Sequence, residues 1–541
     1  MLSQSLLSIL KKFQPLPSTS FHFNHHLDSC SSLSQLKQVH ALILTNGSHK
    51  SLPVSTKLVN KAVSLSPTMD YARQVFDAMP HRDVFLWNTL IRGYSHLGPC
   101  NEAILTYRNM HRSGLSPDNF TLTSVIRSCT VLSALREGKQ GHCYVIKNGF
   151  DLDVYIQSSL VTMYAQNDEH SDSEQAFDDI VTRNVVTWTA MIAANVQNGY
   201  LIKGLKTFIE MVNSGTKPNV ITLVSVLPSC ASLQFLNMGM LIHGLGVKLG
   251  VDSYISLTNS LIAFYGKCGN ITISRALFDQ METRTLVSWN AMIATYEQNN
   301  HNESAIKLFH KMQEKNINFD GITMVSVISA CGGLGALDTG KQVHNIDLAS
   351  NVFNTSDHRT VVLWTSIISA YASHGHGKEA INLFMKMKNE GIKPNSVTFM
   401  AVLTACRHSG LIEEGKKYFK SMSEDYFVIP GIEHCTSMVD LLGKNGKLLE
   451  AYEFIQNMPI DPDVDVWSAL LSACRIHGNL ELAEIVADRI YKIDPRSYAI
   501  YVMMINMYAD AGRWEDVTRL RMFLDEMEVK RICGHTFLAD L

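Results

Sequence analysis

The chain has 541 residues, of which 46% are apolar and 18% are charged, and its formal net charge is −3 at pH 7. One globular core is not expected at this length, so the chain must form several domains or one array of repeats. The nearly balanced charge excludes a polycation that holds nucleic acid by bulk charge, and no apolar run is long enough to span a bilayer.

The N-terminal segment has the composition of a targeting peptide. The first 27 residues contain no Asp or Glu, but they contain Lys11, Lys12 and several serines. Apolar residues between Met1 and Phe13 recur at amphipathic spacing. This pattern is typical of an organelle transit peptide, which we assign to residues 1–25, and it favours a mitochondrion over a chloroplast. Because the segment has no Arg, a merely disordered terminus is the alternative.

A tract that begins at Val84 returns three times along the chain. Its tryptophans, Trp87, Trp188 and Trp289, are spaced by 101 residues, and Trp364 follows after 75. A second marker is a cysteine that closes a Ser-Val-x-x-Ser/Ala-Cys phrase, at Cys129, Cys230 and Cys331, spaced by 101 residues, and Cys406 follows after 75. An internal repeat of this length predicts a stack of similar units. At the cysteine position, which Cys474 also occupies, a small, buried and reduced side chain suffices.

The 101-residue period divides into units of 35, 35 and 31 residues, at 84–118, 119–153 and 154–184, and again at 185–219, 220–254 and 255–285. Each unit holds two apolar-periodic segments separated by a breaker such as Gly98-Pro99. Many units end like Ser113–Asp118, where Gly ends one helix, Pro prevents its continuation and Asp caps the next. The sequence therefore predicts an all-α solenoid of stacked helical hairpins.

The 35-residue unit, its Pro-Asp or Pro-Asn ending and the 35-35-31 alternation resemble the PLS subclass of plant organellar pentatricopeptide repeat (PPR) proteins. Further marks that are similar to those of this family are Gly138–His142 and Gly340–His344 in long units, Met163-Tyr164 and Ala276–Asp279 in short units, Gly431–His434 at the terminal long-to-short junction, and Trp467–Cys474 and Tyr501–Trp514 in the extension motifs E1 and E2.

The resemblance covers roughly residue 25 to the end and implies a right-handed superhelical solenoid of helix-turn-helix repeats. It implies degenerate long and short repeats over 26–83, a PLS array over 84–360 and a terminal set of P, L2 and S2 repeats over 361–463. The E1 and E2 motifs would follow over 464–541.

One departure is a deficit of 26 residues between Trp289 and Trp364. After His344, a piece ending at Arg359 aligns with Asn270–Arg284, the back half of a short unit. The chain has thus lost the end of a long unit and the start of a short one. The hybrid unit, residues 321–360, should still close as one hairpin with an unusually long second helix. The sequence leaves open whether the deletion is natural or an error of gene prediction.

A second departure concerns catalysis. Catalytic members of the resembled family carry a zinc deaminase (DYW) domain with His-x-Glu and Pro-Cys-x-x-Cys. This sequence has one His-x-Glu, at His301–Glu303 in a repeat turn, and no Cys-x-x-Cys. The recurring His142, His243 and His344 come from different hairpins, so they are not expected to converge on one ion. We expect no DYW domain, no enzymatic activity, no metal and no cofactor.

The fifth residue of each hairpin lies in the first turn of its first helix, and the last residue directly precedes the next first helix. Stacking should bring both side chains together, facing one base of single-stranded RNA. Asn offers a donor and an acceptor, Thr a hydroxyl and Asp only acceptors, so such pairs can discriminate between bases. The predicted RNA-binding pairs are Asn88/Asp118, Ser158/Asn184, Thr189/Asn219, Asn259/Thr285, Asn290/Asp320, Thr365/Asn395 and Thr436/Asp463.

Under the recognition code of the resembled family, Asn with Asp implies uracil, Thr or Ser with Asn implies adenine, and Thr with Asp implies guanine. Asn259/Thr285 is ambiguous, with a pyrimidine as its candidate. The long units should space rather than read, because most of their fifth residues cannot hydrogen-bond a base; these residues are Thr123, Val224, Val325 and Met400. Helix capping alone is the alternative for the last position. The tryptophans are expected to pack between hairpins rather than stack on bases.

The resemblance implies a sequence-specific single-stranded RNA-binding protein of a plant organelle that selects sites for C-to-U editing and recruits a deaminase in trans through its E motifs. Splicing, stabilisation or translation of organelle RNA is a second hypothesis. A protein-interaction scaffold is a third, from another class. The expected partners are organelle RNA and editing-complex proteins, without a membrane, and the chain is expected to be a monomer.

Overall fold

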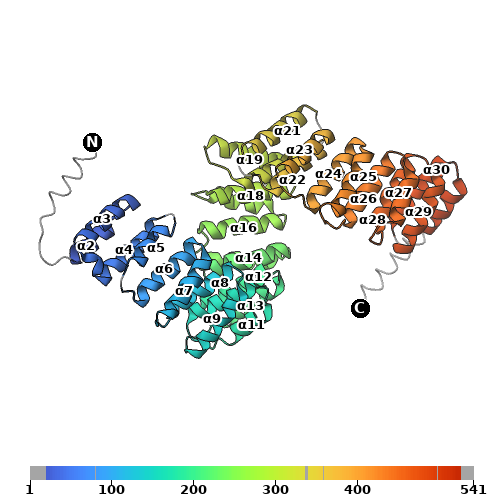
Figure 1. The fold of residues 1–541 in the computed structure, drawn as a ribbon. Coiled ribbons are helices and arrows are strands. Elements are labelled where there is room, and N and C mark those ends of the chain that lie inside the picture. The colour runs from blue at the N-terminus through green and yellow to red at the C-terminus, as the bar shows by residue number, and fades with distance from the viewer. Residues whose placement is uncertain are drawn as a thin grey trace, which may run out of the picture. The chain divides into compact units, whose positions relative to one another are not determined.

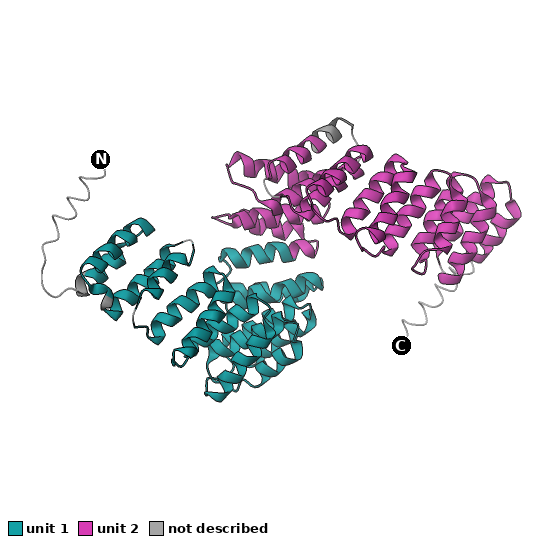
Figure 2. Cartoon of the chain, viewed as in Figure 1, with its two compact units in different colours: residues 1–264 teal, residues 265–541 magenta. Residues whose placement is uncertain are grey.

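The structure, a computed structural model, describes residues 20–66, 68–79, 81–334, 339–356, 359–495 and 497–524, with the backbone alone for residues 20–22, 50 and 339–345. Within these ranges the chain is built from helices and has no strand. It divides into two compact units, residues 1–264 and 265–541, and the division falls within one helix, α16 (Ile255–Lys267) (Figure 2). None of the helices in the described ranges has the length and apolarity to cross a membrane.

Unit 1 alternates first and second helices of successive hairpins. Its first helices are α2 (Ser20–Ser29), α4 (Leu52–Leu65), α6 (Val84–Leu97), α8 (Asn119–Val131), α10 (Val154–Gln166), α12 (Val185–Gln197) and α14 (Val220–Ser232). Its second helices are α3 (Leu33–Thr45), α5 (Asp70–Asp77), α7 (Cys100–Arg112), α9 (Leu135–Lys147), α11 (His170–Asp178), α13 (Leu201–Asn213) and α15 (Leu236–Lys248). A short turn of 3-10 helix, η1 (Ser48–Lys50), precedes α4.

Unit 2 continues the alternation. Its first helices are α18 (Leu286–Gln298), α20 (Gly321–Gly333), α22 (Val361–Ser373), α24 (Ser396–Ser409), α26 (Ile432–Lys444), α28 (Val464–Ile476) and α30 (Tyr498–Asp510). Its second helices are α17 (Ile271–Gln280), α19 (Asn302–Glu314), α21 (Thr339–Asn354), α23 (Gly377–Asn389), α25 (Ile412–Glu424), α27 (Leu448–Gln456) and α29 (Leu480–Ile493).

Each unit is a two-layered stack (Figure 1). Consecutive first helices pack against one another and form a continuous inner layer, as α8 does with α6 and α10, and as α22 does with α20 and α24. Second helices cover this layer, and most pack between the first helix of their own hairpin and that of the next. The predicted all-α stack of helical hairpins is confirmed. Its first helices begin at Val84, Asn119, Val154, Val185 and Val220, the residues at which the repeat units of the sequence begin.

The ends of the hairpins follow from local sequence. Asp118 is the N-cap of α8, and its side chain accepts a hydrogen bond from the backbone N–H of Thr121 at 2.9 Å. Thr121 returns a bond by accepting from the N–H of Asp118 at 3.2 Å, which completes a capping box. Gly114, two residues after α7 ends, has φ +82°, a left-handed conformation that favours glycine. The Gly-x-x-Pro-Asp ending therefore stops one helix and starts the next.

A joint of three side chains recurs where a short unit meets the next hairpin. The ring of Trp364 at the start of α22 meets the edge of Phe353 at the end of α21, with ring centroids 4.7 Å apart. The guanidinium carbon of Arg359 lies 4.8 Å from the centre of the Phe353 ring and 5.8 Å from that of Trp364. The same joint is formed by Phe76, Arg82 and Trp87 and by Phe177, Arg183 and Trp188. At Phe278, Arg284 and Trp289 the two rings meet in the same way and the guanidinium lies over the Phe ring.

The tryptophans of these joints are buried, so they pack between hairpins as predicted. The five cysteines of the shared repeat position are also buried. Burial raises the pKa of Cys129, Cys331 and Cys406 to about 12 and that of Cys474 to about 11. These thiols therefore stay protonated at neutral pH and serve as small core side chains, as predicted.

The hybrid unit forms a hairpin of α20 and α21. Helix α21 has 16 residues, whereas the other α-helices in the described ranges have between 8 and 14. The predicted transit peptide, residues 1–25, lies outside the described residues except for residues 20–25, which form the start of α2. The predicted extension motifs contain α28, α29, α30 and a further helix over 514–524, and their residues 525–541 lie outside the described ranges.

We expect Trp364→Ala to destabilise the protein by about 3–5 kcal/mol, because truncating a buried Trp removes its apolar contacts and leaves a cavity. The matched control is Trp514→Ala, since Trp364 is 1% exposed and Trp514 is 65% exposed. Thermal unfolding followed by circular dichroism at 222 nm should show a lower midpoint for the first variant and almost no change for the second. Equal midpoints for the two variants would contradict a stabilising role of Trp364 in the joint.

Candidate nucleic-acid interface

The fifth residue of one hairpin and the last residue of the same hairpin lie on neighbouring first helices. Asn88 is in the first turn of α6, and Asp118 caps α8. The amide nitrogen of Asn88 donates to both carboxylate oxygens of Asp118, at 2.9 and 2.8 Å. Asn290 in α18 donates in the same way to Asp320 at the start of α20, at 3.0 Å. The structure thus brings together both predicted Asn/Asp pairs.

The pairs of Thr with Asn are joined through a third residue. The hydroxyls of Thr189 and Thr222 are 2.7 Å apart, and that of Thr222 donates to the side-chain oxygen of Asn219 at 3.0 Å. In unit 2, the hydroxyl of Thr365 lies 2.7 Å from that of Thr398, which donates to Asn395 at 2.9 Å. Two further predicted pairs are therefore connected, although not by direct contact.

The connecting threonine is a residue that the sequence analysis did not identify. It is the third residue of each first helix in the long units, and it forms the capping box there, at Thr121, Thr222, Thr323 and Thr398. Thr121 and Thr323 donate to the side-chain oxygens of Asn88 and Asn290, 33 residues earlier. The signal in the sequence was a Thr that recurs three residues after every Asp or Asn ending before a long unit.

Three predicted pairs are not brought together in this way. The hydroxyl of Ser158 donates to the carbonyl of Tyr155 at 3.0 Å, and that of Thr436 donates to the carbonyl of Ile432 at 2.9 Å. Their partners Asn184 and Asp463 cap α12 and α28. For the third pair, Asn259 belongs to unit 1 and Thr285 to unit 2, so each is described within its own unit. The buried Oδ1 of Asn259 has no hydrogen-bond partner among the described residues.

The two members differ in exposure in three of the four connected pairs, whereas Asn88 and Asp118 are both half-buried. Thr189, Asn290 and Thr365 are 7–9% exposed, whereas Asn219 and Asn395 are exposed and Asp118 and Asp320 are half-buried. The last residue therefore presents most of the polar surface, while the fifth residue presents one edge and fixes its neighbour by hydrogen bonds.

Asp320 is held as a carboxylate. Burial would raise its pKa, but hydrogen bonds from the backbone of Thr323, the amide of Asn290, the hydroxyl of Thr323 and the backbone of Ile322 together hold the pKa below its ordinary value. At neutral pH the side chain is therefore ionised. A carboxylate has about four lone-pair directions, so lone pairs remain to accept a hydrogen bond from a ligand.

A row of exposed apolar side chains occupies the second position of the first helices, three residues before the fifth. Position two and position five lie on one face of a helix, because three residues make nearly one turn. These side chains were not identified from the sequence. They are Phe85, Phe120, Tyr155, Val186 and Ile221 in unit 1, and Val287, Ile322, Val362 and Val397 in unit 2.

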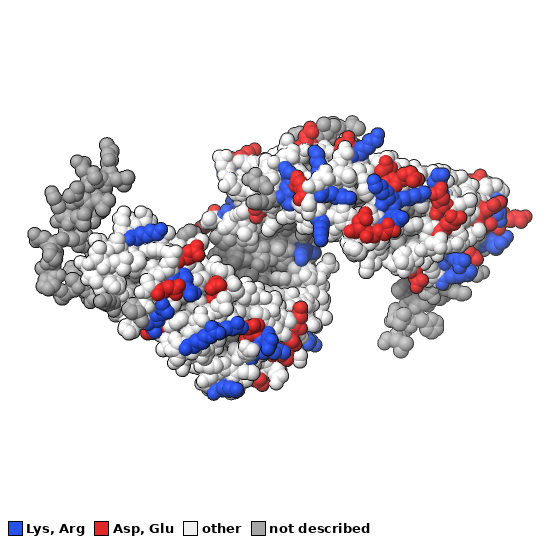
Figure 3. All heavy atoms as spheres, viewed as in Figure 1, with Lys and Arg blue, Asp and Glu red and all other residues white. Residues whose placement is uncertain are grey.

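Charged side chains form ion pairs within helices and between neighbouring second helices. In unit 1, Arg108 on α7 contacts Glu137 on α9 at 3.3 Å, and Lys139 on α9 contacts Asp172 on α11 at 3.0 Å. On the face shown in Figure 3, cations and anions lie interspersed over both units. Exposed pairs of this kind contribute between 0 and about 1 kcal/mol each, so they do not define a binding site.

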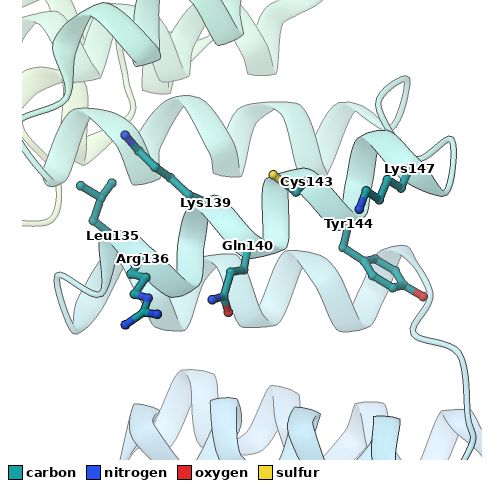
Figure 4. A pocket seen from close by; sticks show the side chains of 7 residues that line it. All are labelled: Leu135, Arg136, Lys139, Gln140, Cys143, Tyr144 and Lys147. Carbon is teal, nitrogen blue, oxygen red and sulfur yellow. The ribbon is translucent and has the colours of Figure 1, made fainter.

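A surface depression on unit 1 is lined by residues of α9 alone, which are Leu135, Arg136, Lys139, Gln140, Cys143, Tyr144 and Lys147 (Figure 4). It lies along a single second helix, and its Lys139 is already paired with Glu169 and Asp172 of the next hairpin. It is therefore a weaker candidate site than the row of polar pairs.

The recurring histidines have structural partners where they are described. The Nδ1 atom of His142 lies 2.8 Å from the hydroxyl of Tyr164 on the next first helix. His344 lies outside the residues whose side chains are described. Over the described part of the chain, no cluster of three or more His, Cys, Asp or Glu side chains is arranged to hold a metal ion.

These features define a class: a helical-repeat protein that presents a row of capped polar pairs along its first helices. The description "PPR repeat family" matches residues 82–130, 183–232, 284–333 and 359–424. "PPR repeat" matches 257–286 and 433–460, and "E motif" matches 477–539. The chain belongs to the pentatricopeptide repeat family.

Among the proteins that are similar to this chain are two from Arabidopsis thaliana. The pentatricopeptide repeat-containing protein At1g11290, chloroplastic, is 36% identical over 95% of this chain and 67% of its own length. The pentatricopeptide repeat-containing protein At4g19191, mitochondrial, is 33% identical over 97% of this chain and 85% of its own. Among solved structures, that of the pentatricopeptide repeat protein PPR10 in complex with an 18-nt psaJ RNA element shares the fold, with a TM-score of 0.51 and 16% identity over 93% of this chain and 78% of that one.

We expect the hydroxyl relay to appear as an energetic coupling in a double-mutant cycle. Thr222→Val keeps the shape of the side chain but leaves Thr189 and Asn219 without their buried partner, at a cost of about 1–3 kcal/mol. Combining Thr222→Val with Thr189→Val should cost less than the sum of the single variants, as measured by thermal unfolding. Combining it with Thr123→Val, whose hydroxyl donates only to the carbonyl of Asn119 in its own helix, should be additive. Additivity in both cycles would show that no relay exists.

Proposed function

We propose that this protein binds single-stranded RNA in a sequence-specific manner in a plant organelle. The observation that carries the proposal is the polar pair that repeats along the first helices, with Asn88 joined to Asp118 and Asn290 to Asp320. A scaffold that binds a peptide does not require these pairs. One base per helical repeat, read by two or three side chains, is the known mode of recognition by proteins of this architecture.

Chemistry supports the assignment of bases. Asp accepts hydrogen bonds, and the Watson–Crick edges of uracil and guanine each carry a ring N–H donor. Asn both donates and accepts, which suits the ring nitrogen and amino group of adenine. The Asn/Asp pairs Asn88/Asp118 and Asn290/Asp320 would then read uracil, Thr189/Asn219 and Thr365/Asn395 would read adenine, and Thr436/Asp463 would read guanine.

The exposed apolar side chains at position two support the same mode. Phe85 and Phe120 flank the Asn88/Asp118 pair along the chain, one on each of the two helices that carry it. A base that meets the pair would lie between two apolar surfaces, and stacking on aromatic side chains contributes about 1–3 kcal/mol per base. Such contacts tolerate any base, so in this proposal position two supplies affinity and the polar pair supplies selectivity.

The finer proposal is selection of sites for C-to-U editing. It rests on the match to the E motif over 477–539 and on the resemblance to editing factors. In this proposal the E-motif region recruits a zinc deaminase that acts in trans and supplies the chemistry. Because relatives are labelled chloroplastic or mitochondrial, an organelle is the proposed location, and the amphipathic N-terminus favours the mitochondrion.

We expect an RNA built from these assignments to bind more tightly than a scrambled RNA, and Thr436→Asn to change the preferred base at one position, from guanine to uracil. A mismatched base typically costs about 1–3 kcal/mol. The measurement is a fluorescence-anisotropy titration at fixed salt concentration with the four RNAs that vary at this base. The matched control is Thr518→Asn, because the exposed Thr518 also donates only to a carbonyl of its own helix, that of Trp514.

Equal affinity for the designed and the scrambled RNA would contradict the proposal and favour a protein-interaction scaffold. Weaker binding of all four RNAs by Thr436→Asn would indicate that the substitution disturbs α26 rather than base recognition.

For the editing role, we expect plants that lack the protein to lose C-to-U conversion at one or a few organelle cytidines that lie downstream of a sequence matching the pairs. Comparison of organelle transcripts with and without the protein is the measurement. Intact editing together with a defect in splicing or transcript abundance would instead support another role in organelle RNA metabolism.

A further inference from the structure

The hybrid hairpin changes the number of hairpins between two predicted base-reading pairs. In the regular part of the array, the first unit of one triplet begins three hairpins before the first unit of the next triplet, as at Val84 and Val185. Between the unit that begins at Leu286 and the one that begins at Val361, the structure has only two hairpins, α18 with α19 and α20 with α21. All of these helices lie in unit 2.

First helices remain in direct contact across the junction. A Cβ atom placed on Gly332 of α20 would come within 3.0 Å of the Cα atom of Ala370 in α22, so the two helices approach as closely as glycine allows. The Nε2 atom of His374 at the end of α22 lies 2.7 Å from the carbonyl oxygen of Cys331 in α20. No gap of one hairpin is therefore left between α20 and α22.

Similar contacts occur at two regular junctions, which provide a reference. Asn198 at the end of α12 donates to the carbonyl of Ala165 in α10 at 2.7 Å. His408 at the end of α24 lies 2.9 Å from the carbonyl of Ala372 in α22. A side chain that follows or ends one first helix thus bonds the last turn of the preceding one at all three junctions, with nearly equal distances. The step from α20 to α22 is an ordinary step of the stack.

The second helix of the hybrid hairpin contacts α22 through the same Phe–Trp pair that occurs at regular junctions. Phe353 and Trp364 have ring centroids 4.7 Å apart, and the regular pairs Phe177 and Trp188, and Phe278 and Trp289, have centroids 5.1 and 5.2 Å apart. The hybrid therefore combines the first helix of a long unit with the joint of a short unit. Both of its surfaces match those of a regular neighbour.

Polar pairs on both sides of the hybrid are intact. Asn290, Asp320 and Thr323 are linked at the α18–α20 step, and Thr365, Thr398 and Asn395 at the α22–α24 step. The hybrid itself has Val325 at its fifth position, which cannot hydrogen-bond a base. Its last residue is Thr360, whose hydroxyl accepts from the N–H of Leu363 at 3.3 Å.

We propose that the hybrid hairpin shortens the RNA register of this protein by one nucleotide. The register is the spacing, along the RNA, of the bases that the polar pairs read. This inference rests on the proposed reading of one base per hairpin. The uracil read by Asn290/Asp320 and the adenine read by Thr365/Asn395 are then separated by one unread nucleotide, U-N-A. A complete triplet would separate them by two, U-N-N-A. The preferred RNA of this chain is therefore shorter than its 35-35-31 pattern implies.

The test compares two RNAs that match the assignments of the full chain and differ only in this spacer of one or two nucleotides, each made in both strand polarities, with a scrambled RNA as reference. The full-length protein should bind the one-nucleotide spacer at least about tenfold more tightly than the two-nucleotide spacer in the preferred polarity. A wrong spacer misplaces the bases for Thr365/Asn395 and Thr436/Asp463 together, and each mismatch costs about 1–3 kcal/mol.

A second variant identifies the register without relying on affinity. The double substitution Thr365→Asn and Asn395→Asp copies the Asn290/Asp320 pair, and Asp caps this helix as well as Asn does. The variant should prefer uracil at the second nucleotide after the uracil read by Asn290/Asp320, counted in the preferred polarity. The control is the same base scan on the unchanged protein, which should prefer adenine there.

The two failures can be distinguished. Preference for the longer spacer, equal binding of the two spacers above the scrambled RNA, or a changed preference at the third nucleotide in the variant would each overturn the shortened register and leave specific RNA binding intact. Equal binding of all RNAs, the scrambled one included, would overturn the proposed function and the register with it.

Discussion

The contact between neighbouring hairpins is the constraint on which the rest of this structure depends. A single hairpin cannot bury its own apolar face, so each must be covered by the next. The joint of Phe, Arg and Trp makes this contact specific. The Trp ring is buried against the Phe ring, and the Arg guanidinium lies over the Phe ring. Arg82 and Arg284 also donate to backbone carbonyls of the preceding helix, those of Phe76 and Asp77 and those of Phe278 and Asp279. This joint holds the next first helix at the short-unit junctions, and direct packing between consecutive first helices sets their spacing at the other steps.

Polar pairs depend on this spacing. Asn88 reaches Asp118 only because α6 and α8 lie side by side, and Thr121 can bond both residues because it sits one turn into α8. The cap of one helix and the pair between two helices therefore use the same carboxylate. Capping is compatible with the proposed base recognition, since the capping bonds fix the carboxylate without using all of its lone pairs.

Much of the fold could be predicted from the sequence because its signals are local. The Gly-x-x-Pro-Asp/Asn endings mark helix boundaries, and the spacing of the tryptophans marks the joints. The relay through Thr222 and Thr398 could not be predicted, because it links residues 33 positions apart and depends on the rotation of stacked helices. Thr436 shows the converse. The residue that corresponds to the connecting Thr in α28 is Val466, which has no hydroxyl, so Thr436 bonds its own helix instead.

Exposed apolar residues at position two were missed for a related reason. A Val or Ile in an amphipathic helix is normally expected in the core, and only the stack shows that Val287 and Ile322 lie on its open side. For the candidate site, the structure connects four of the seven predicted pairs, and the sequence did not show which atoms are already used by the protein itself.

The deletion can be understood from the same nearest-neighbour rule. In a stack where each hairpin contacts only its neighbours, the loss of residues is tolerated if the remaining hairpin presents one regular surface to each side. The fusion meets this condition, since α20 keeps the first-helix contacts of a long unit while Phe353 and Arg359 keep the joint of a short one. A cut offset by one or two residues would have placed Phe353 on a different side of α21 and left Trp364 without its partner, because each residue turns a helix by about 100°. The fold therefore constrains where such a chain can be shortened, and the allowed cuts remove a whole step of the inner layer.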